Sequence, residues 1–179
     1  QISRANLFNY IESELKAIET LLKPAKSNEY ARVDASSAWA LLAKLYLNAE
    51  VYTGAAKYTE AVTYCNKIIA ISGYSLTGTY RFLFLADNNA TSTSETIFPV
   101  TFDGNKTRTW GGTTYLVHAP IVGSMSPGTH GVDFGWGGLR TTKQFVQKFA
   151  DPSGATDKRA SFHSSGQNYE HNYSDIYSL

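Results

Sequence analysis

Apolar residues keep a helical spacing through the first part of the chain and lose it after Tyr74. Between Leu7 and Leu22 they recur every three or four positions, which is the spacing of one helix face. Pro24 ends this first run, because proline removes a backbone donor and clashes with the preceding turn. The pattern indicates a mainly α fold in which helices precede a less regular region.

Two further helices are predicted from about Ala35 to Tyr52 and from about Ala56 to Ile71. Small residues at Ala38, Ala43 and Ala61 would let these two helices approach closely. A short turn between them makes a helical hairpin, which is how a tetratricopeptide-like unit is built. Because one such unit cannot bury both of its faces, we expect further helices to pack against it.

The remaining sequence contains turn residues, aromatic residues and short β-favouring runs. Residues 80–85 and 96–102 are predicted strands, and residues 105–139 are rich in Gly, Thr and aromatic side chains without a sustained period. A helix is predicted over 141–149, and a polar tail begins at residue 164. We therefore expect short β-strands and a loop-rich ligand-binding face.

The length of 179 residues and the net charge of +1 limit the possible functions. Charges of both signs are mixed, which argues against nucleic acid as a partner. The chain starts at Gln1 and has no leader sequence, so we expect it to be an internal piece of one larger domain. Within that piece, about 5–74 is helical, about 75–140 is loop-rich, and 141–179 holds a helix and the polar tail.

Residues that could perform catalysis are poorly arranged in the sequence. The four histidines have no metal-ligand spacing, and Cys65 is predicted to face a helix core, so we expect no metal, no cofactor and no nucleophilic thiol. Carboxylates for sugar hydrolysis could come from Asp87, Glu95, Asp103 and Asp133. The simpler interpretation is that Asp87 and Asp103 stabilise turns. A calcium ion near Asp87 and Glu95 stays open, although the usual calcium-loop pattern is absent.

Two tryptophans, each followed by paired glycines, are the main candidates for binding. Trp110-Gly111-Gly112 and Trp136-Gly137-Gly138 lie in the loop-rich region, where each ring could either fill a small core or form an open surface for a ligand. Trp136, which precedes a predicted helix, is the preferred sugar platform, whereas Trp110 could be rim or packing. Flat rings stack on the C–H faces of sugars, and polar groups bind the hydroxyls. The candidate glycan-binding residues are the rings Trp110, Tyr115 and Trp136 with the polar side chains Asn105, Arg108, Asp133 and Arg140.

Several segments together resemble the SusD/RagB family of glycan-binding lipoproteins from the surface of Bacteroidetes. The resemblance covers most of the chain and is carried by Ala40–Gly54, Glu95-Thr-Ile-Phe-Pro99, Gly135–Arg140 and Asp157-Lys-Arg159. It implies tetratricopeptide-like helix pairs that support a looped glycan-binding face, with loop aromatics as the sugar platform. It also implies a protein without enzymatic activity.

The resemblance further implies a place and a partner. Such a protein sits at the outer membrane through a lipid anchor that lies outside this sequence, and it covers a SusC-like TonB-dependent transporter. Two alternatives are a protein- or peptide-interaction component that binds no glycan, and a fragment of a glycoside hydrolase.

Overall fold

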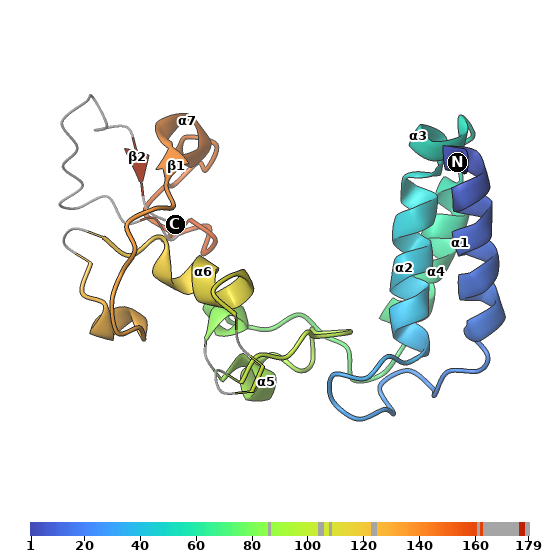
Figure 1. Ribbon diagram of the computed structural model, residues 1–179, viewed down its shortest axis with the longest axis horizontal. Coiled ribbons are helices and arrows are strands. Elements are labelled where there is room, and N and C mark those ends of the chain that lie inside the picture. Colours follow the sequence, from blue (N-terminus) through green and yellow to red (C-terminus); the bar gives the residue numbers. More distant parts are fainter. Residues whose placement is uncertain are drawn as a thin grey trace. The chain divides into compact units, whose positions relative to one another are not determined.

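The computed structural model describes residues 1–85, 87–103, 106–107, 109–122, 125–160, 162 and 176–177. The fold is mainly α, as predicted. Backbone contacts divide the chain into two compact units (Figure 1). The helical unit comprises Gln1–Thr77 and Asn89–Thr101, and the aromatic unit comprises Gly78–Asn88 and Phe102–Leu179.

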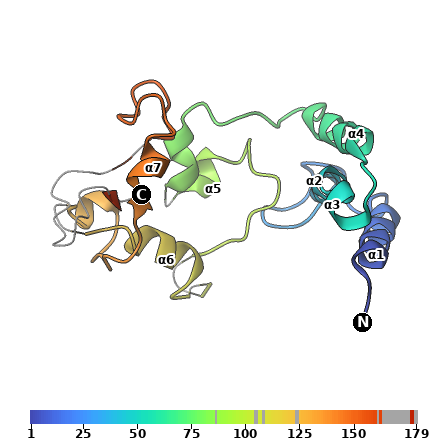
Figure 2. The same ribbon diagram turned by 90° about the horizontal axis from the view of Figure 1, so that it is seen from above.

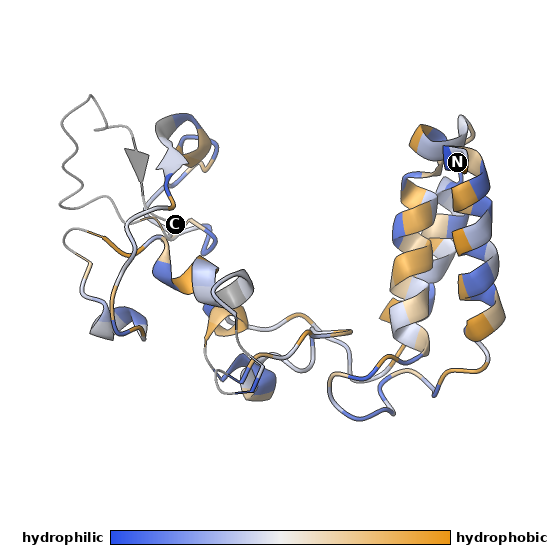
Figure 3. Cartoon of the chain, viewed as in Figure 1, coloured by the Kyte–Doolittle hydropathy of each residue, from blue (hydrophilic) through white to orange (hydrophobic). Residues whose placement is uncertain are grey.

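The main helices of the helical unit lie together, seen from the side in Figure 1 and from above in Figure 2. They are α1 (Arg4–Ile18), α2 (Ala35–Leu47), α3 (Ala49–Thr53) and α4 (Tyr58–Ile69). The α2 and α4 helices pack closely and form the predicted hairpin, while α1 packs on α2 and α3. Figure 3 shows α2 as hydrophobic along most of its length, whereas hydrophobic and hydrophilic residues alternate along α1.

The core of this unit lies where α1, α2 and α4 meet. It consists of Phe8, Leu42, Tyr46, Ala49 and Ala61, and Leu42 is completely buried. The rings of Phe8 and Tyr46 meet edge to face with centroids 6.4 Å apart. The small side chains of Ala49 and Ala61 leave room for these rings, so large and small residues interlock across the helix pair.

Two glutamates, Glu12 on α1 and Glu19 directly after it, bind tyrosine and lysine side chains. The Oε1 atom of Glu12 accepts hydrogen bonds from the Tyr46 hydroxyl at 2.7 Å and from Lys16 Nζ at 2.9 Å, and Lys57 Nζ lies 3.3 Å away. One heptad later, Glu19 accepts from the Tyr64 hydroxyl at 3.1 Å. The hydrogen bonds of these carboxylates therefore join α1 to the neighbouring helices, in addition to its apolar contacts.

The start of α2 is fixed by a buried carboxylate. Asp34 accepts hydrogen bonds from the backbone N–H groups of Ser36 and Ser37, and Ser37 completes a capping box. Its second oxygen accepts from the Lys26 backbone N–H at 2.8 Å, which ties the preceding loop to the helix. The Ser36 hydroxyl also contacts the Tyr74 hydroxyl at 2.6 Å.

The single helix predicted from Ala35 to Tyr52 is instead two helices, α2 and α3. The break falls at Asn48, whose backbone leaves the helical region and whose side-chain amide donates to the Lys44 carbonyl. An asparagine side chain can compete in this way with the backbone hydrogen bonds of a helix. The break was not predicted because the apolar spacing continues through it. The α3 helix ends at Gly54, which adopts the left-handed conformation.

Cys65 does not face the core, contrary to the prediction. Its side chain is exposed, and so are those of Tyr58, Val62 and Ile69 on the same side of α4. The apolar spacing of α4 was correct, but it covers two sides of the helix. One side packs on α2 through Ala61, and the other is exposed in the part of the chain that the structure describes.

The aromatic unit is built from short elements: η1 (Tyr80–Phe84), α6 (Gly112–His118), η2 (Gly128–His130), β1 (Thr141–Thr142), α7 (Lys143–Val146) and β2 (Ile176–Tyr177). The four-residue helix α5 (Asn88–Thr91) spans the boundary with the helical unit in the sequence. The β1 and β2 strands pair antiparallel, with Thr141 opposite Tyr177. Short strands are therefore present, but not where the sequence predicted them.

The strands predicted at 80–85 and 96–102 were wrong. Residues 80–84 form the 3₁₀ helix η1, in which the rings of Tyr80 and Phe84 meet at 5.1 Å, a contact that one helical turn brings about. Residues 96–102 are irregular, and Pro99 lacks the N–H group that a paired strand needs. Neither segment has a neighbouring strand to pair with in the described part of the chain.

The helix predicted over 141–149 is present only in part. Only α7 is helical, preceded by β1 and followed by turns, and the Thr142 hydroxyl accepts a hydrogen bond from the Phe145 backbone N–H. Val146 is buried, whereas Phe145 is 48% exposed. Four residues are too few for a helix to be stable alone, so packing decides the local structure here.

Candidate functional site

Five rings of the aromatic unit form one connected group, which we call the aromatic cluster: Trp110, Tyr115, His118, Phe134 and Trp136. The α6 helix supplies two of them, since Tyr115 and His118 lie three residues apart on one face. The sequence reading missed α6, because its Thr-rich start has low helix propensity and its seven residues are too few to reveal a period.

The Trp136 ring is the centre of the cluster. Its centroid lies 6.2 Å from that of Trp110, 6.0 Å from that of Tyr115 and 5.1 Å from that of His118. The imidazole is nearly parallel to the indole, with an interplanar angle of 27°, and therefore covers one of its faces. Trp110 and Tyr115 are tilted against Trp136, by 40° and 58°.

Exposure differs strongly among these rings. Trp110 is 79% exposed and Tyr115 is 42% exposed, whereas Trp136 is partly buried by its neighbours. Trp136, the ring preferred from the sequence as the open platform, is instead packed into the cluster, and Trp110 stands open beside it. An indole that is mostly in water gains from being covered by a ligand with an apolar face.

The glycines around Trp136 allow its backbone to dock closely on residues 119–122. Trp136 N–H donates to the His118 carbonyl at 3.0 Å, and the N–H groups of Gly137 and Gly138 donate to the carbonyls of Ile121 and Ala119. A Cβ atom on Gly135 would lie 2.2 Å from the Ile121 carbonyl oxygen, which only glycine avoids. Gly135 therefore admits the backbone of Ile121, and this docking holds the segment that carries Trp136 in place.

His118 is held at both of its ring nitrogens, and the sequence reading did not assign it to the site. Its Nδ1 lies 2.8 Å from the Thr114 carbonyl oxygen, and its Nε2 lies 3.2 Å from Oδ1 of Asp133. The same Asp133 oxygen accepts from the Phe134 backbone N–H. The only sequence clue was the position of His118 three residues after Tyr115 in an aromatic-rich region.

The polar residues predicted for the site have different surroundings. Asp133 lies beside the cluster with its side chain 74% exposed. Arg140 is partly buried, and its guanidinium donates to the Leu139 carbonyl at 2.7 Å. The prediction for Asn105 and the related one for Arg108 concern positions outside the described residues.

The other candidate chemical groups have local structural roles. Asp103 accepts hydrogen bonds from the Lys106 and Thr107 backbone N–H groups, which is the predicted turn. Glu95 accepts from the Thr77 backbone N–H. Within the described ranges, no group of three or more His, Cys, Asp or Glu side chains is arranged to hold a metal ion.

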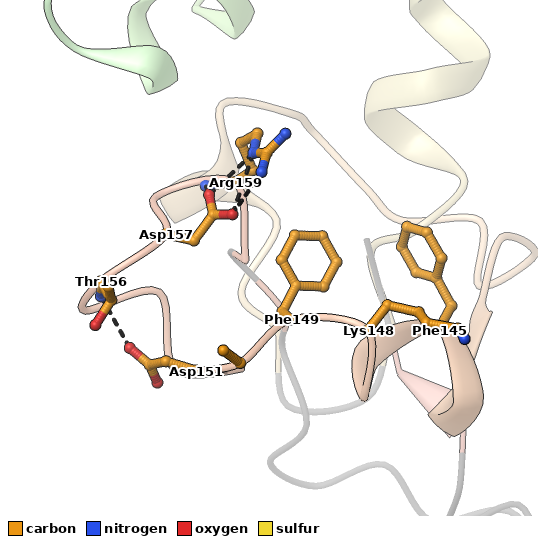
Figure 4. Close-up of a pocket in the computed structure, with 8 residues that line it drawn as sticks. Phe145, Lys148, Phe149, Asp151, Thr156, Asp157 and Arg159 are labelled. Carbon is orange, nitrogen blue, oxygen red and sulfur yellow. Dashed lines mark hydrogen bonds and ion pairs between the residues drawn. The ribbon is translucent and has the colours of Figure 1, made fainter.

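A hollow lies between α7 and the loop that follows it (Figure 4). Phe145 and Phe149 form one wall, with ring centroids 5.7 Å apart, and the loop from Asp151 to Arg159 forms the other. The loop carboxylates bind within the loop itself. Asp157 forms a two-point ion pair with Arg159, and Asp151 accepts from the Thr156 backbone N–H.

These bonds explain the acidity of the two loop carboxyls. Hydrogen bonds, first from the Ser153 hydroxyl and then from backbone N–H groups, lower the pKa of Asp151 to about 2. Hydrogen bonds from Arg159 lower the pKa of Asp157 to about 2 in the same way. Both groups are fully used in shaping the loop, so the aromatic cluster is the better candidate for binding.

Comparison with known proteins gives one informative relative. No protein-family model matches the chain. Over 145 residues, which are 80% of the chain, it is 41% identical to the starch-binding protein SusD of Bacteroides thetaiotaomicron. The match includes 26% of that protein, so the chain spans about a quarter of the length of this curated relative. Among the described residues, no helix combines the length and the apolar character needed to cross a membrane.

Proposed function

The chain belongs to the SusD-like family, and from this premise we propose that it binds an oligosaccharide or polysaccharide at the bacterial cell surface without cleaving it. The observation that carries the proposal is the contact between Trp110, Tyr115 and Trp136, which joins two exposed rings to a firmly held one. The relative is named a starch-binding protein, so malto-oligosaccharides are the first ligands to test.

The geometry of the cluster suits a sugar chain. Neighbouring ring centroids are about 6 Å apart and the rings are tilted, so together they offer a curved apolar surface rather than a single plane. Covering one sugar face with an aromatic ring contributes on the order of 1–2 kcal/mol. The exposed carboxylate of Asp133 lies beside the rings, where it can accept hydrogen bonds from sugar hydroxyls.

We further propose that the bound glycan passes to a SusC-like TonB-dependent transporter in the outer membrane, to which the protein is attached by a lipid anchor. Family resemblance is the support for this step. The proposal of a non-catalytic role rests on the same resemblance. It also rests on the carboxylates of Asp103 and Glu95, which accept hydrogen bonds from nearby backbone N–H groups.

The test is to titrate the protein with malto-oligosaccharides and with a panel of plant and host glycans, and to analyse each mixture for cleaved products. The expected result is saturable binding to at least one glycan class with no product released. Release of shorter sugars would replace the proposal with a hydrolase. Absence of binding to every glycan of the panel would favour the alternative, a component that binds proteins or peptides in an uptake complex.

A further inference from the structure

We propose that His118 is a positioning residue of this site: it supports one face of Trp136 and makes glycan binding depend on pH. The inference rests on the proposed glycan-binding function and deepens it. It assigns one face of Trp136 to the protein, so that a sugar reaches only the opposite face and the neighbouring rings of Trp110 and Tyr115.

The first argument is that His118 contacts Trp136 in two independent ways. Its imidazole stacks on the indole with centroids 5.1 Å apart, and its backbone carbonyl accepts the Trp136 N–H at 3.0 Å. The Phe134 ring meets the imidazole edge to face at 5.7 Å. The His118 side chain is only 17% exposed, so the imidazole is sandwiched inside the cluster rather than presented to a ligand.

The second argument comes from the hydrogen-bond partners of the imidazole. The Thr114 carbonyl at Nδ1 and the Asp133 carboxylate at Nε2 are both acceptors. Both contacts are hydrogen bonds only when both ring nitrogens carry hydrogen, and such a ring is positively charged. A cation against the face of a tryptophan is attractive, so the stack on Trp136 and the bond to Asp133 support each other.

The surroundings determine how pH acts on this arrangement. The titratable groups that face the imidazole or the ring it supports are Asp133, from the segment after η2, and Tyr115, from the same helix as His118. Histidine side chains change charge between about pH 5 and 8. When the imidazole loses one proton it keeps a single donor, the bond to Asp133 or Thr114 is lost, and the support for Trp136 weakens.

The first experiment compares glycan affinity at about pH 5.5 and pH 8 by calorimetry, a range that spans the histidine titration. The wild-type protein is expected to bind roughly five- to tenfold more tightly at the lower pH, which corresponds to the net contribution of one ordinary hydrogen bond. The variants His118→Phe, which keeps a flat ring, and His118→Gln, which keeps an amide donor, are expected to bind equally at both pH values. The control His130→Gln alters another histidine of the same unit, on η2, and should retain the wild-type dependence.

The second experiment observes His118 directly. Nitrogen-detected NMR of the histidine rings at about pH 5.5 should show hydrogen on both ring nitrogens of His118, and Asp133→Asn should alter the Nε2 signal, because Asp133 is the partner of that atom. A single ring N–H, or a wild-type pH dependence that persists in His118→Phe, would overturn the positioning role alone. Absence of glycan binding at both pH values would instead overturn the proposed function, and the role of His118 with it.

Discussion

The rings of Trp110 and Trp136, which precede two separate Gly-Gly pairs, lie with their centroids 6.2 Å apart. One of them is 79% exposed and the other is packed among aromatic neighbours. One tryptophan therefore fills a small core and the other is open to a ligand, and the packed ring supports the open one. It also explains why an exposed indole can hold a defined position in a region of short elements.

Because Gly135 packs directly on the Ile121 backbone, we expect substitution of this glycine to reduce glycan binding. Gly135→Ala would bring a Cβ to 2.2 Å from the Ile121 carbonyl oxygen, so the segment carrying Trp136 must shift and glycan binding should fall at least about tenfold. Gly138→Ala is the matched control, since a Cβ there would meet nothing within 4 Å. Calorimetric titration of both variants checks this, and equal binding by the two would contradict it.

The completely buried Leu42 should dominate the stability of the helical unit. Leu42→Ala removes apolar contacts from the point where α1, α2 and α4 meet, and we expect the free energy of unfolding to fall by about 2–5 kcal/mol. Leu41→Ala alters the neighbouring position, which is 55% exposed, and should change the stability by less than about 0.5 kcal/mol. Urea unfolding followed by far-UV circular dichroism measures both. Similar losses would mean that α2 packs differently.

Asp34 joins the start of α2 to the loop before it, so its loss should cost more than a simple helix cap. Asp34→Ala removes acceptors for the N–H groups of Ser36 and Lys26, and we expect a loss of about 2 kcal/mol or more. Ser3→Ala removes the exposed cap of α1 and should cost about 1 kcal/mol or less. Thermal unfolding of the two variants would contradict this account if Ser3→Ala were the more damaging.

The hydrogen bonds of Glu12 predict how the stability of the helical unit changes at acidic pH. Burial opposes the charge of Glu12, but hydrogen bonds from Tyr46, Lys16 and Lys57 outweigh it, so its pKa lies below the ordinary value of 4.5. A lowered carboxyl pKa stabilises the fold above about pH 4.5, and this contribution is lost as the pH falls through the folded-state pKa.

Unfolding titrations between pH 7 and pH 3 check this prediction. Glu12→Gln should be less stable than wild type at neutral pH and should lose less stability on acidification. Glu14→Gln, an exposed position on the same helix, should keep the wild-type profile. Parallel curves for wild type and Glu12→Gln would show that this carboxylate does not stabilise the fold.

Sequence reasoning succeeded where a long apolar period fixes the structure. The α2 and α4 hairpin could be predicted because Ala38, Leu42, Ala43 and Ala61 follow the helical spacing and are all buried. The same reasoning failed at Asn48 and at Cys65. At Asn48 a single side-chain hydrogen bond ends a helix, and at Cys65 the apolar spacing does not say which side finds a partner.

The candidate site was predictable in its residue types but not in its arrangement. Two Trp-Gly-Gly segments suggested rings near one another, yet the contact between them depends on α6 and on backbone bonds from residues 136–139 to residues 118–121. Those bonds have no side-chain pattern, so no periodicity reveals them. His118 was missed for the same reason, since its partners Thr114, Asp133 and Trp136 come together only in the folded chain.

The most direct test of glycan binding by the aromatic cluster is calorimetry of Trp110→Ala beside Trp39→Phe, a tryptophan of α2 in the helical unit. Because Trp110 is 79% exposed, its removal should leave the thermal midpoint nearly unchanged. The account predicts that Trp110→Ala weakens glycan binding about tenfold, as expected from the loss of one stacked sugar face, while Trp39→Phe binds like wild type. Wild-type affinity in Trp110→Ala, at an unchanged thermal midpoint, would contradict it.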